Sequence, residues 1–364
     1  MRWVDFALRG VLCLMLFAGL PAEAQMPDMS DSEKAAAAKR HHLSKGGFRN
    51  PPNSPRRNES ARVRWSFFGN IIRRNLTAAP PDIPDMHVVP AAEARRALAT
   101  AGNTDTLTWI GHAGFLVRLG GVNILTDPIW SKRASPLRFA GPKRLTPPGL
   151  PMEALPPIDV VVVSHAHYDH LDVATLARLP DRENITAIAP LGLGKYFKGY
   201  KRVYEVDWYD TVELENGFKL TAYPAVHWSN RTPFDRNRTL WMSYGFSAGG
   251  RSVYHTGDTD VHPTLFGEIG AHMARTHGGC DIGLMSVGAY EPRAIMSGSH
   301  TDPEGGAQMG RDIGCKTMVP MHWGTFILSF EPFDAPRARF AAAAGDAARV
   351  FRIGETQAIS AMLE

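Results

Sequence analysis

The feature that most constrains the fold is a β-branched run followed at once by a cluster of histidine and aspartate. Residues 158–164 read IDVVVVS, and residues 165–170 read HAHYDH. A continuous β-branched run is typical of a strand buried on both faces of its sheet. Open α/β sheets bind their ligands where the chain leaves the carboxyl end of such a strand. The cluster therefore stands where a functional site is expected.

The side chains of this cluster are those that bind divalent metals, because imidazole nitrogens and carboxylate oxygens are ligands of zinc and similar ions. Residues two apart in an extended segment point the same way, so His165 and His167 can share one metal. Asp169 and His170 lie past a bend and can address a second. Six positions supply at most four ligands, so further ligands must come from other strand ends.

Three other polar residues stand at the ends of apolar runs, namely His227, Asp258 and His322. Each has an ordinary alternative. A histidine at a strand end can be simply hydrogen-bonded, and an aspartate in a GDT sequence is typical of a turn. Taken together with the central cluster, all three are candidate metal ligands.

Short strands separated by turns dominate from residue 104 onward, which predicts two sheets covered by helices in an α/β fold. Gly120-Gly121 is expected to form a hairpin turn. The expected strands are 106–110, 114–119, 122–126, 158–164, 202–206, 211–214, 217–223, 240–246, 252–256, 281–287 and 316–321. Helical patterns lie near 172–178, 192–199, 263–275, 303–313 and 335–344.

The first 24 residues predict a signal peptide. Arg2 and Arg9 flank its start, residues 10–20 are apolar, and Ala22-Glu23-Ala24 has the pattern that a signal peptidase accepts. An eleven-residue helix is too short to cross a bilayer. We therefore expect export to the periplasm or medium, with an uncleaved, buried or interfacial N-terminus as the alternative.

Residues 25–100 predict a basic, proline-rich arm. The segment 31–75 holds eleven basic and three acidic residues, and proline-rich stretches at 50–57 and 79–85 favour poor order. The segment 64–75, RWSFFGNIIRRN, predicts either a strap docked on the body or an interfacial anchor on anionic lipid. Because the basic charge belongs to the arm and not to the body, a general nucleic-acid binder is not expected.

The ordered set of Asp127, the HAHYDH cluster, His227, Asp258 and His322 resembles the metallo-β-lactamase superfamily, whose fold is a four-layer αβ/βα sandwich. The resemblance extends to the N-acylphosphatidylethanolamine-hydrolysing phospholipase D family and covers about residues 104–356. It implies a catalytic domain over 101–364. The sequence motifs on which the resemblance rests include WIGHAGFLV (109–117), LTDPIWSKRASP (125–136), HWSNRT (227–232), GAYEPR (288–293), HTDPEGGAQ (300–308) and MHWGTF (321–326).

The resemblance implies a centre of two zinc ions. One zinc would be held by His165, His167 and His227, the second by Asp169, His170 and His322, and both by Asp258. Two such ions can share a hydroxide that attacks phosphorus in line while they neutralise developing charge.

Other residues receive roles around this centre. Asp169 would also orient the nucleophile, and Asp127 would fix the histidine loop by hydrogen bonds. Asp172 is a similar candidate, with helix capping as the alternative. His300 would protonate the leaving alkoxide or bind a phosphate oxygen, unless it is a loop residue before the next helix.

Three more residues lie in the segments that carry the resemblance. Tyr290 and Arg293 would face the head group, or Arg293 would form a turn ion pair with Glu291. His112 is expected to be a buried, hydrogen-bonded residue at a strand turn.

The function so implied is a zinc-dependent phosphodiesterase of phospholipase D type. It would hydrolyse N-acylphosphatidylethanolamine or related glycerophospholipids to phosphatidate and an N-acylethanolamine. The alternatives are a lactonase or other small-ester hydrolase, an iron-dependent persulfide oxygenase with one metal, and a non-enzymatic basic-arm protein. A phospholipid substrate implies peripheral membrane contact, and a homodimer is compatible with the sequence.

Two cysteines remain after removal of a signal peptide, Cys280 and Cys315, and each immediately precedes an apolar strand. If these strands are adjacent and parallel, the two sulfurs start side by side. Lateral pairs in a flat sheet rarely reach disulfide torsions, and free cysteine is a common small core residue. We therefore expect two buried free thiols, with a disulfide as the alternative.

Overall fold

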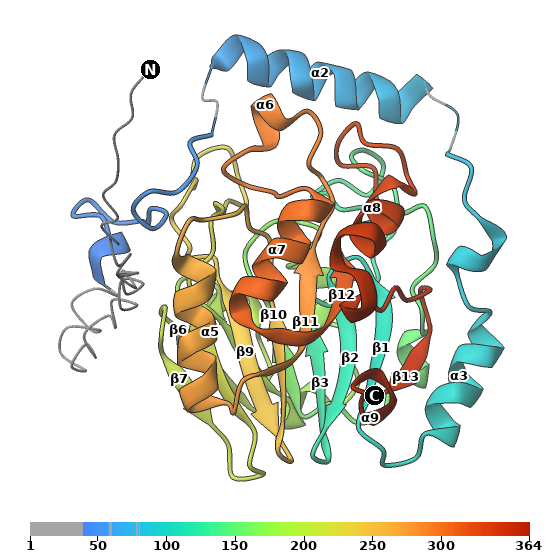
Figure 1. Ribbon diagram of the computed structural model, residues 1–364. Coiled ribbons are helices and arrows are strands. Elements are labelled where there is room, and N and C mark those ends of the chain that lie inside the picture. Colours follow the sequence, from blue (N-terminus) through green and yellow to red (C-terminus); the bar gives the residue numbers. More distant parts are fainter. Residues whose placement is uncertain (1–38, 58–59, 78, 80) are drawn as a thin grey trace, which may run out of the picture. The chain divides into compact units, whose positions relative to one another are not determined.

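Two β-sheets form the centre of the protein (Figure 1). The computed structural model describes residues 39–57, 60–77, 79 and 81–364. Over these residues, one sheet has seven strands in the order β13-β1-β2-β3-β4-β5-β6, and the other has six in the order β12-β11-β10-β9-β8-β7. The predicted signal peptide and the first part of the predicted arm lie outside the described residues.

The strands are β1 (Thr106–Gly111), β2 (Gly114–Leu119), β3 (Val122–Thr126), β4 (Val160–Val162), β5 (Thr186–Pro190), β6 (Arg202–Val206), β7 (Thr211–Glu213), β8 (Lys219–Tyr223), β9 (Ser243–Ala248), β10 (Arg251–His255), β11 (Cys280–Ser286), β12 (Cys315–Met321) and β13 (Thr356–Ala358). The α-helices are α2 (Ala61–Thr77), α3 (Ala91–Thr100), α4 (Val173–Leu176), α5 (Leu265–Thr276), α6 (Arg293–Met296), α7 (Pro303–Ile313), α8 (Ala335–Ala344) and α9 (Ile359–Met362).

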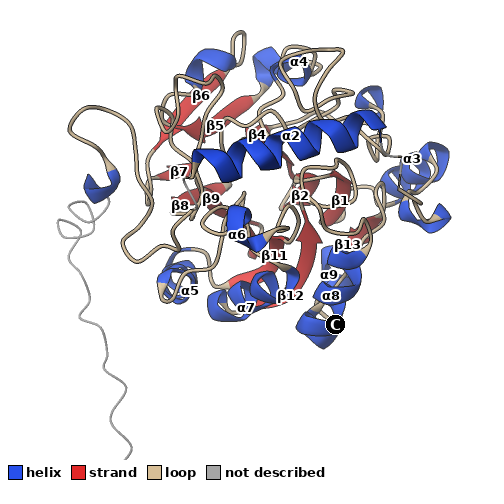
Figure 2. Ribbon diagram, turned by 90° about the horizontal axis from the view of Figure 1, so that it is seen from above, coloured by secondary structure: helices blue, strands red, loops and turns tan. Residues whose placement is uncertain are grey.

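Helices cover the outer faces of both sheets, which confirms the predicted four-layer αβ/βα sandwich. Seen from above, α5, α7 and α8 lie outside the six-stranded sheet, and α4 lies beyond the seven-stranded sheet (Figure 2). The inner faces of the sheets pack against each other through a core of large apolar side chains, each contributing about 1.5–3 kcal/mol by burial. This core includes Trp109, Phe115, Phe218, Phe246 and Tyr254.

The boundaries of α7 show how local sequence sets these elements. The Asp302 carboxylate accepts a hydrogen bond from the backbone N–H of Gly305, and Pro303 begins the helix. Gly314 ends it at φ +80°, the left-handed conformation that suits glycine. The helix has the bounds predicted from sequence, as does the hairpin at Gly120-Gly121.

Several elements differ from the prediction. The strand β5, the helices α2 and α3, and the edge strand β13 were not expected. The predicted helix near 192–199 is a single 3-10 turn at Gly194–Tyr196.

The described part of the arm is ordered, so the prediction of poor order does not hold for it. Residues 40–364 form one compact unit. Phe48 is buried in the main core, and on α2 the side chains of Phe67 and Ile71 are buried against Ile295 and Met296. The helix runs across the top of the molecule above α6 (Figure 1). Residues 40–57 together with α2, here called the strap, are therefore a docked part of the body.

The cysteine prediction is wrong, because Cys280 and Cys315 form a disulfide. They are the first residues of β11 and β12, which run parallel as neighbours with these two residues in register. Their Cα atoms lie 4.5 Å apart, within the range that a disulfide spans.

Candidate metal centre

In the seven-stranded sheet, β1 and β3 are both antiparallel to β2, and β4 is parallel to β3, so these three strands run in one direction. In the six-stranded sheet, β8 and β10 are both antiparallel to β9, and β10, β11 and β12 are parallel, so β8, β10 and β12 run in one direction. The carboxyl ends of these strands therefore meet at one edge of the sandwich. The residues that follow these ends are His112, Asp127, the 165–170 cluster, His227, Asp258 and His322.

One group of donors comprises His165, His167, His227 and Asp258, whose ligand atoms all lie within 4.8 Å of one another. His167 Nδ1 lies 2.8 Å from His165 Nε2 and 3.2 Å from His227 Nε2. The lone pairs of three imidazole nitrogens directed at one point repel one another unless a positive charge lies between them. The donor set, three nitrogens and one carboxylate oxygen, is the one that zinc-like ions take.

A second group comprises His112, Asp169, His170 and His322. Asp169 Oδ2 lies 3.5 Å from His170 Nε2 and 3.3 Å from His322 Nε2. His112 Nε2 donates to the same oxygen at 2.9 Å. The group again mixes imidazole nitrogens with a carboxylate.

A single oxygen of Asp258 joins the two groups. Its Oδ2 lies 3.7 and 3.8 Å from the Nε2 atoms of His165 and His227, and 3.1 Å from the Nε2 atoms of both His170 and His322. All seven residues expected as ligands are thus brought together, with Asp258 in the central position that the resemblance implied.

The far nitrogens of the ligand histidines are held by the fold. His170 Nδ1 donates to Asp127 Oδ2 at 2.7 Å, and His227 Nδ1 donates to the Ser299 carbonyl at 2.8 Å. Asp127 also accepts from the backbone N–H and the hydroxyl of Ser164, both at 2.7 Å. Such contacts fix the tautomer and orientation of a metal-binding imidazole.

Replacing Asp127 with asparagine is expected to lower metal affinity or activity by about 10- to 100-fold, the usual effect of removing a partner of a ligand. The amide keeps the shape of the carboxylate but cannot accept from His170 and Ser164 with equal strength. Metal titration of the purified variant measures this effect. Unchanged affinity together with unchanged activity would contradict the assigned role.

Burial controls the charge of the first group. It lowers the pKa of His167 and of His227 to about 3 each, and it holds the pKa of His165 well below its ordinary value. These imidazoles are therefore neutral at physiological pH, which is the form that binds metal.

The carboxylates control the charge of the second group. Burial alone would lower the pKa of His322, but the charge of Asp258 and the hydrogen bonds of Asp169 and Asp258 outweigh it and raise this pKa to about 9. Burial alone would raise the pKa of Asp258, but the positive charges of His170 and His322 hold it well below its usual range. The centre thus favours positive charge, and its residues fit a metal ion.

His112 joins the site although the sequence predicted only a buried strand-turn residue. It is buried and hydrogen-bonded, as expected, but its partner is Asp169 of the second group. Its ring centre lies 4.1 Å from that of His322. Its position after the first strand, at the same sheet edge as the other ligands, is the signal that could have identified it.

Three site residues have left-handed backbones, namely His112 at φ +57°, Asp127 at φ +35° and His322 at φ +65°. This conformation is uncommon for residues other than glycine. It turns each side chain sharply from the end of its strand toward the centre.

His300 lies beside the centre, with ligand atoms of Asp258 and His322 within 4.8 Å. Its Nδ1 lies 3.9 Å from Asp258 Oδ2, and its ring centre is 5.0 Å from that of His227. The Arg293 side chain is 35% exposed. It pairs with Asp260 at 3.1 Å and donates to the His300 carbonyl, so it positions the loop that carries His300.

Tyr290 and Asp172 have partners outside the two donor groups. Tyr290 is only 1% exposed, with the Arg339 guanidinium 4.8 Å from its ring centre, so it is not available to a head group. Asp172 has the alternative role of helix cap. It accepts from Thr175 N at the start of α4 and from Ser131 N at 2.9 Å, which anchors the loop after β3.

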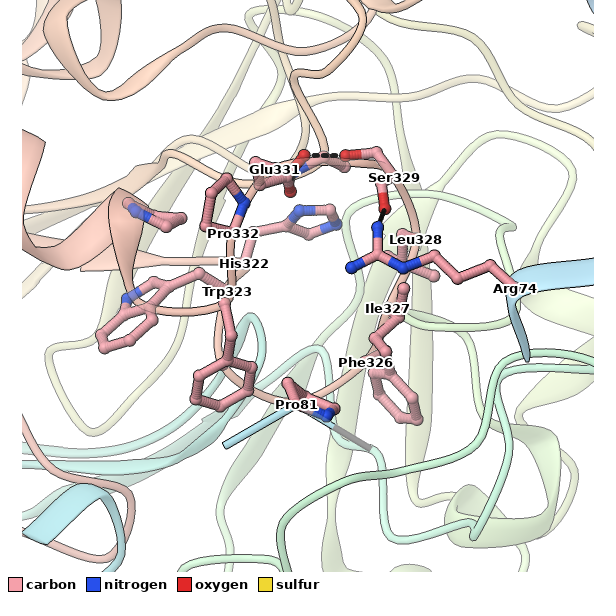
Figure 3. Close-up of a pocket in the computed structure, with 14 residues that line it drawn as sticks. Arg74, Pro81, His322, Trp323, Phe326, Ile327, Leu328, Ser329, Glu331 and Pro332 are labelled. Atoms are coloured by element: carbon pink, nitrogen blue, oxygen red, sulfur yellow. Dashed lines mark hydrogen bonds between the residues drawn. The ribbon is translucent and has the colours of Figure 1, made fainter. Parts of the chain in front are cut away.

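A small cavity of about 30 Å³ lies beside His322 (Figure 3). Arg74 of α2 reaches into its rim and donates to the Ser329 carbonyl at 2.9 Å. Leu328 and Phe326 form part of its apolar wall. The strap thus contributes directly to the surroundings of the centre.

Comparison with known proteins agrees with this geometry. The family model of the Beta-lactamase superfamily domain matches residues 122–323. An uncharacterized protein of Mycobacterium tuberculosis (strain ATCC 25618 / H37Rv) is 37% identical over 245 residues, which cover 65% of this chain and 63% of that protein. The N-acyl-phosphatidylethanolamine-hydrolyzing phospholipase D 1 of Caenorhabditis elegans is 37% identical over 230 residues, which cover 60% of this chain and 64% of that protein.

The match thus spans a little under two thirds of the length of these relatives. Among solved structures, Igni18, a metallo hydrolase from the archaeon Ignicoccus hospitalis KIN4/I, superposes with a TM-score of 0.52 at 23% identity, over 70% of this chain and 97% of that one. This likeness shows the fold. The chain belongs to the metallo-β-lactamase superfamily.

Proposed function

We propose that the protein is a phosphodiesterase of phospholipase D type that hydrolyses N-acylphosphatidylethanolamine or related glycerophospholipids to phosphatidate and an N-acylethanolamine. The observation that carries the proposal is the Asp258 oxygen shared by two groups of buried donors. Such a centre suits hydrolysis of a phosphodiester. The likeness to a phospholipase D of this class in C. elegans supports the choice of substrate.

We propose two zinc ions as the cofactor. His165, His167, His227 and Asp258 would hold the first ion, and Asp258 would also be a ligand of the second. When bound, the ions would lower the pKa of water and neutralise charge on phosphoryl oxygens. The second ion would be held by Asp169, His170 and His322.

The chain's own residues supply the remaining roles. Asp169 would orient the nucleophile, since its Oδ2 is held in place by His112. His300 would bind a phosphoryl oxygen of the substrate through Nδ1, a buried atom for which the described part of the chain offers no hydrogen-bond partner. Arg293 would keep His300 in that position by donating a hydrogen bond to the His300 backbone carbonyl.

The test is metal analysis coupled to assays on N-acylphosphatidylethanolamine and on bis(p-nitrophenyl) phosphate. We expect about two zinc ions per chain and hydrolysis of both diesters. A stoichiometry that stays at one, or cleavage of small esters and lactones with neither diester attacked, would contradict the proposal.

We further propose peripheral membrane contact through the edge that carries the centre. Exposed apolar side chains lie on its loops and on α2. Leu137 and Phe139 follow β3, Phe234 follows β8, and Trp65 lies on α2 with 77% of its surface exposed. Aromatic rings at such positions suit a membrane interface. Within the described ranges, no helix is both long and apolar enough to cross a membrane.

Replacing Trp65 with serine is expected to weaken binding to vesicles by about tenfold, because a large apolar side chain no longer enters the interface. Vesicle co-sedimentation measures the binding, and the KM for soluble bis(p-nitrophenyl) phosphate is the control. An equal effect on vesicle binding and on the soluble diester would show that Trp65 acts on the fold alone.

We also propose export of the protein. The disulfide supports it, because disulfides persist in oxidising compartments.

A further inference from the structure

A third group of metal-type donors lies where the strap begins, and it shares no residue with the two groups of the centre. It comprises His41 and His42 of the strap and Asp207, which follows β6. The three ligand atoms all lie within 4.8 Å of one another, as they do in the other groups. The Nε2 atom of His41 lies 2.7 Å from one oxygen of Asp207, and that of His42 lies 2.7 Å from the other oxygen.

The two imidazoles of this group are arranged like a pair in the metal centre. The ring centres of His41 and His42 are 4.5 Å apart, and the ring planes are inclined by 70°. In the first donor group, the ring centres of His165 and His167 are also 4.5 Å apart, and the planes are inclined by 84°. The strap thus repeats the arrangement of two candidate metal ligands, although here the two histidines are adjacent in sequence.

The donors at the start of the strap are held in place by the fold. His41 is only 3% exposed, and its ring stacks on that of Trp208 with 4.0 Å between the ring centres. The Trp208 backbone N–H donates to Asp207 Oδ1 at 2.8 Å, and the Asp207 backbone N–H donates to Asp210 Oδ2 at 2.8 Å. Fixed side chains lose little entropy when they bind an ion. The second carboxylate beside Asp207 favours a positive charge at this place.

An ion can reach this group from solvent, because the side chains of His42 and Asp207 are partly exposed, by 40% and 19%. Two imidazole nitrogens and a carboxylate oxygen are ligands of zinc and similar divalent ions, and water can complete the coordination. Because water enters the coordination and two ligands are partly exposed, the ion should be held less tightly than those of the buried centre. The purified protein should therefore take up this ion only when zinc is added.

We propose that His41, His42 and Asp207, here called the strap site, bind a divalent ion of the zinc type that fastens the start of the strap to the end of β6. This structural site goes beyond the proposed function, because its ion takes no part in hydrolysis. Each imidazole can also hydrogen-bond to Asp207 without an ion, so the test must separate metal binding from hydrogen bonding alone.

The strap site is connected to the metal centre by a short stretch of chain. The Arg49 backbone N–H donates to the His41 carbonyl at 3.0 Å. The side-chain oxygen of the next residue, Asn50, accepts from the backbone N–H of His227, a member of the first donor group, at 3.0 Å. An ion in the strap site should therefore slow the local opening of the segment between the site and the centre.

The test is a calorimetric zinc titration of the purified protein whose centre is already loaded. We expect about one further equivalent per chain in wild type. His42→Ala and Asp207→Asn should each weaken the binding of this equivalent by about 100-fold or more, because loss of even an outer partner of a ligand costs about 10- to 100-fold. Both variants should keep the metal of the centre and the wild-type activity on bis(p-nitrophenyl) phosphate.

His262→Ala is the matched control. His262 Nε2 donates to the Pro52 carbonyl at 2.7 Å, so this residue also ties the strap to the body, but it belongs to no donor group among the described residues. The control should keep the further equivalent with wild-type affinity. Asp258→Asn, which weakens the centre, should keep it as well, so the strap site is tested even if the proposed hydrolysis fails.

Hydrogen exchange locates the bound ion. At a free zinc concentration about ten times the dissociation constant, the backbone amides of residues 42–49 should exchange about tenfold more slowly in wild type. His42→Ala should show no such slowing. The proposal would be overturned by the absence of a further equivalent in wild type, by its persistence with wild-type affinity in both ligand variants, or by its loss in His262→Ala.

Discussion

Replacing Asp258 with asparagine is expected to reduce hydrolytic activity by about 10³-fold while the fold persists. The Oδ2 atom of Asp258 lies within 3.8 Å of imidazole nitrogens from both donor groups. A neutral amide cannot balance positive charge on both sides of it, so both groups should lose metal affinity. The residue lies in a loop beyond β10, so the sheets do not depend on it.

Three measurements check this expectation, namely kcat on a soluble diester, metal content, and circular dichroism for the fold. Asp159→Asn is a matched control, since Asp159 accepts from the Asn123 backbone N–H at 2.8 Å at the amino end of β4. The control should keep both its metal and its activity. An Asp258→Asn protein with full metal content and normal kcat would show that the two groups do not share this carboxylate.

Replacing both Cys280 and Cys315 with alanine is expected to lower the free energy of unfolding by about 3–4 kcal/mol. The bond joins residues 35 positions apart, and its loss frees that length of chain in the unfolded state. Urea denaturation of variant and wild type, with and without reductant, measures the difference. The metal content should not change, because the cysteines begin strands whose opposite ends carry the centre.

The reductant serves as the internal control for the cysteine variant. Reduced wild type should approach the stability of the double variant, which itself should not respond to reductant. Two reactive thiols per chain in the denatured, unreduced protein would show that no bond had formed.

The metal ligands could be predicted because each of them follows an apolar run in the sequence, and strands that run in the same direction end at the same edge of a sheet. A strand buried on both faces ends just before His165, and the histidine spacing in the cluster is local. His227, Asp258 and His322 each follow an apolar run, so the rule that ligands gather at carboxyl ends of parallel strands places them without knowledge of strand order.

Features that depend on register or on remote packing could not be predicted in this way. His112 follows a strand like the others, but nothing in its sequence shows that Asp169 lies within reach. The strand Thr186–Pro190 has two alanines and ends in proline, which hides its β character. The Cys280–Cys315 bond depends on two strands that align residue for residue.

The strap was the hardest segment to predict. Its prolines and arginines favour poor order, and α2 contains Gly69 with no acidic residue in its first turn. The stability of α2 comes from tertiary contacts of Phe67 and Ile71 with Ile295 and Met296 of α6, as is general for helices of low intrinsic preference.

The left-handed backbones at His112, Asp127 and His322 have a consequence for attempts to improve this protein. Each such conformation costs about 1–3 kcal/mol for a residue with a side chain, and glycine or asparagine would adopt it with less strain. A redesign that ranks substitutions by backbone compatibility would therefore select these three positions for replacement and remove two imidazoles of the centre and the carboxylate that holds His170. Thermostable variants should be sought with these positions fixed, even where their replacement raises the melting temperature.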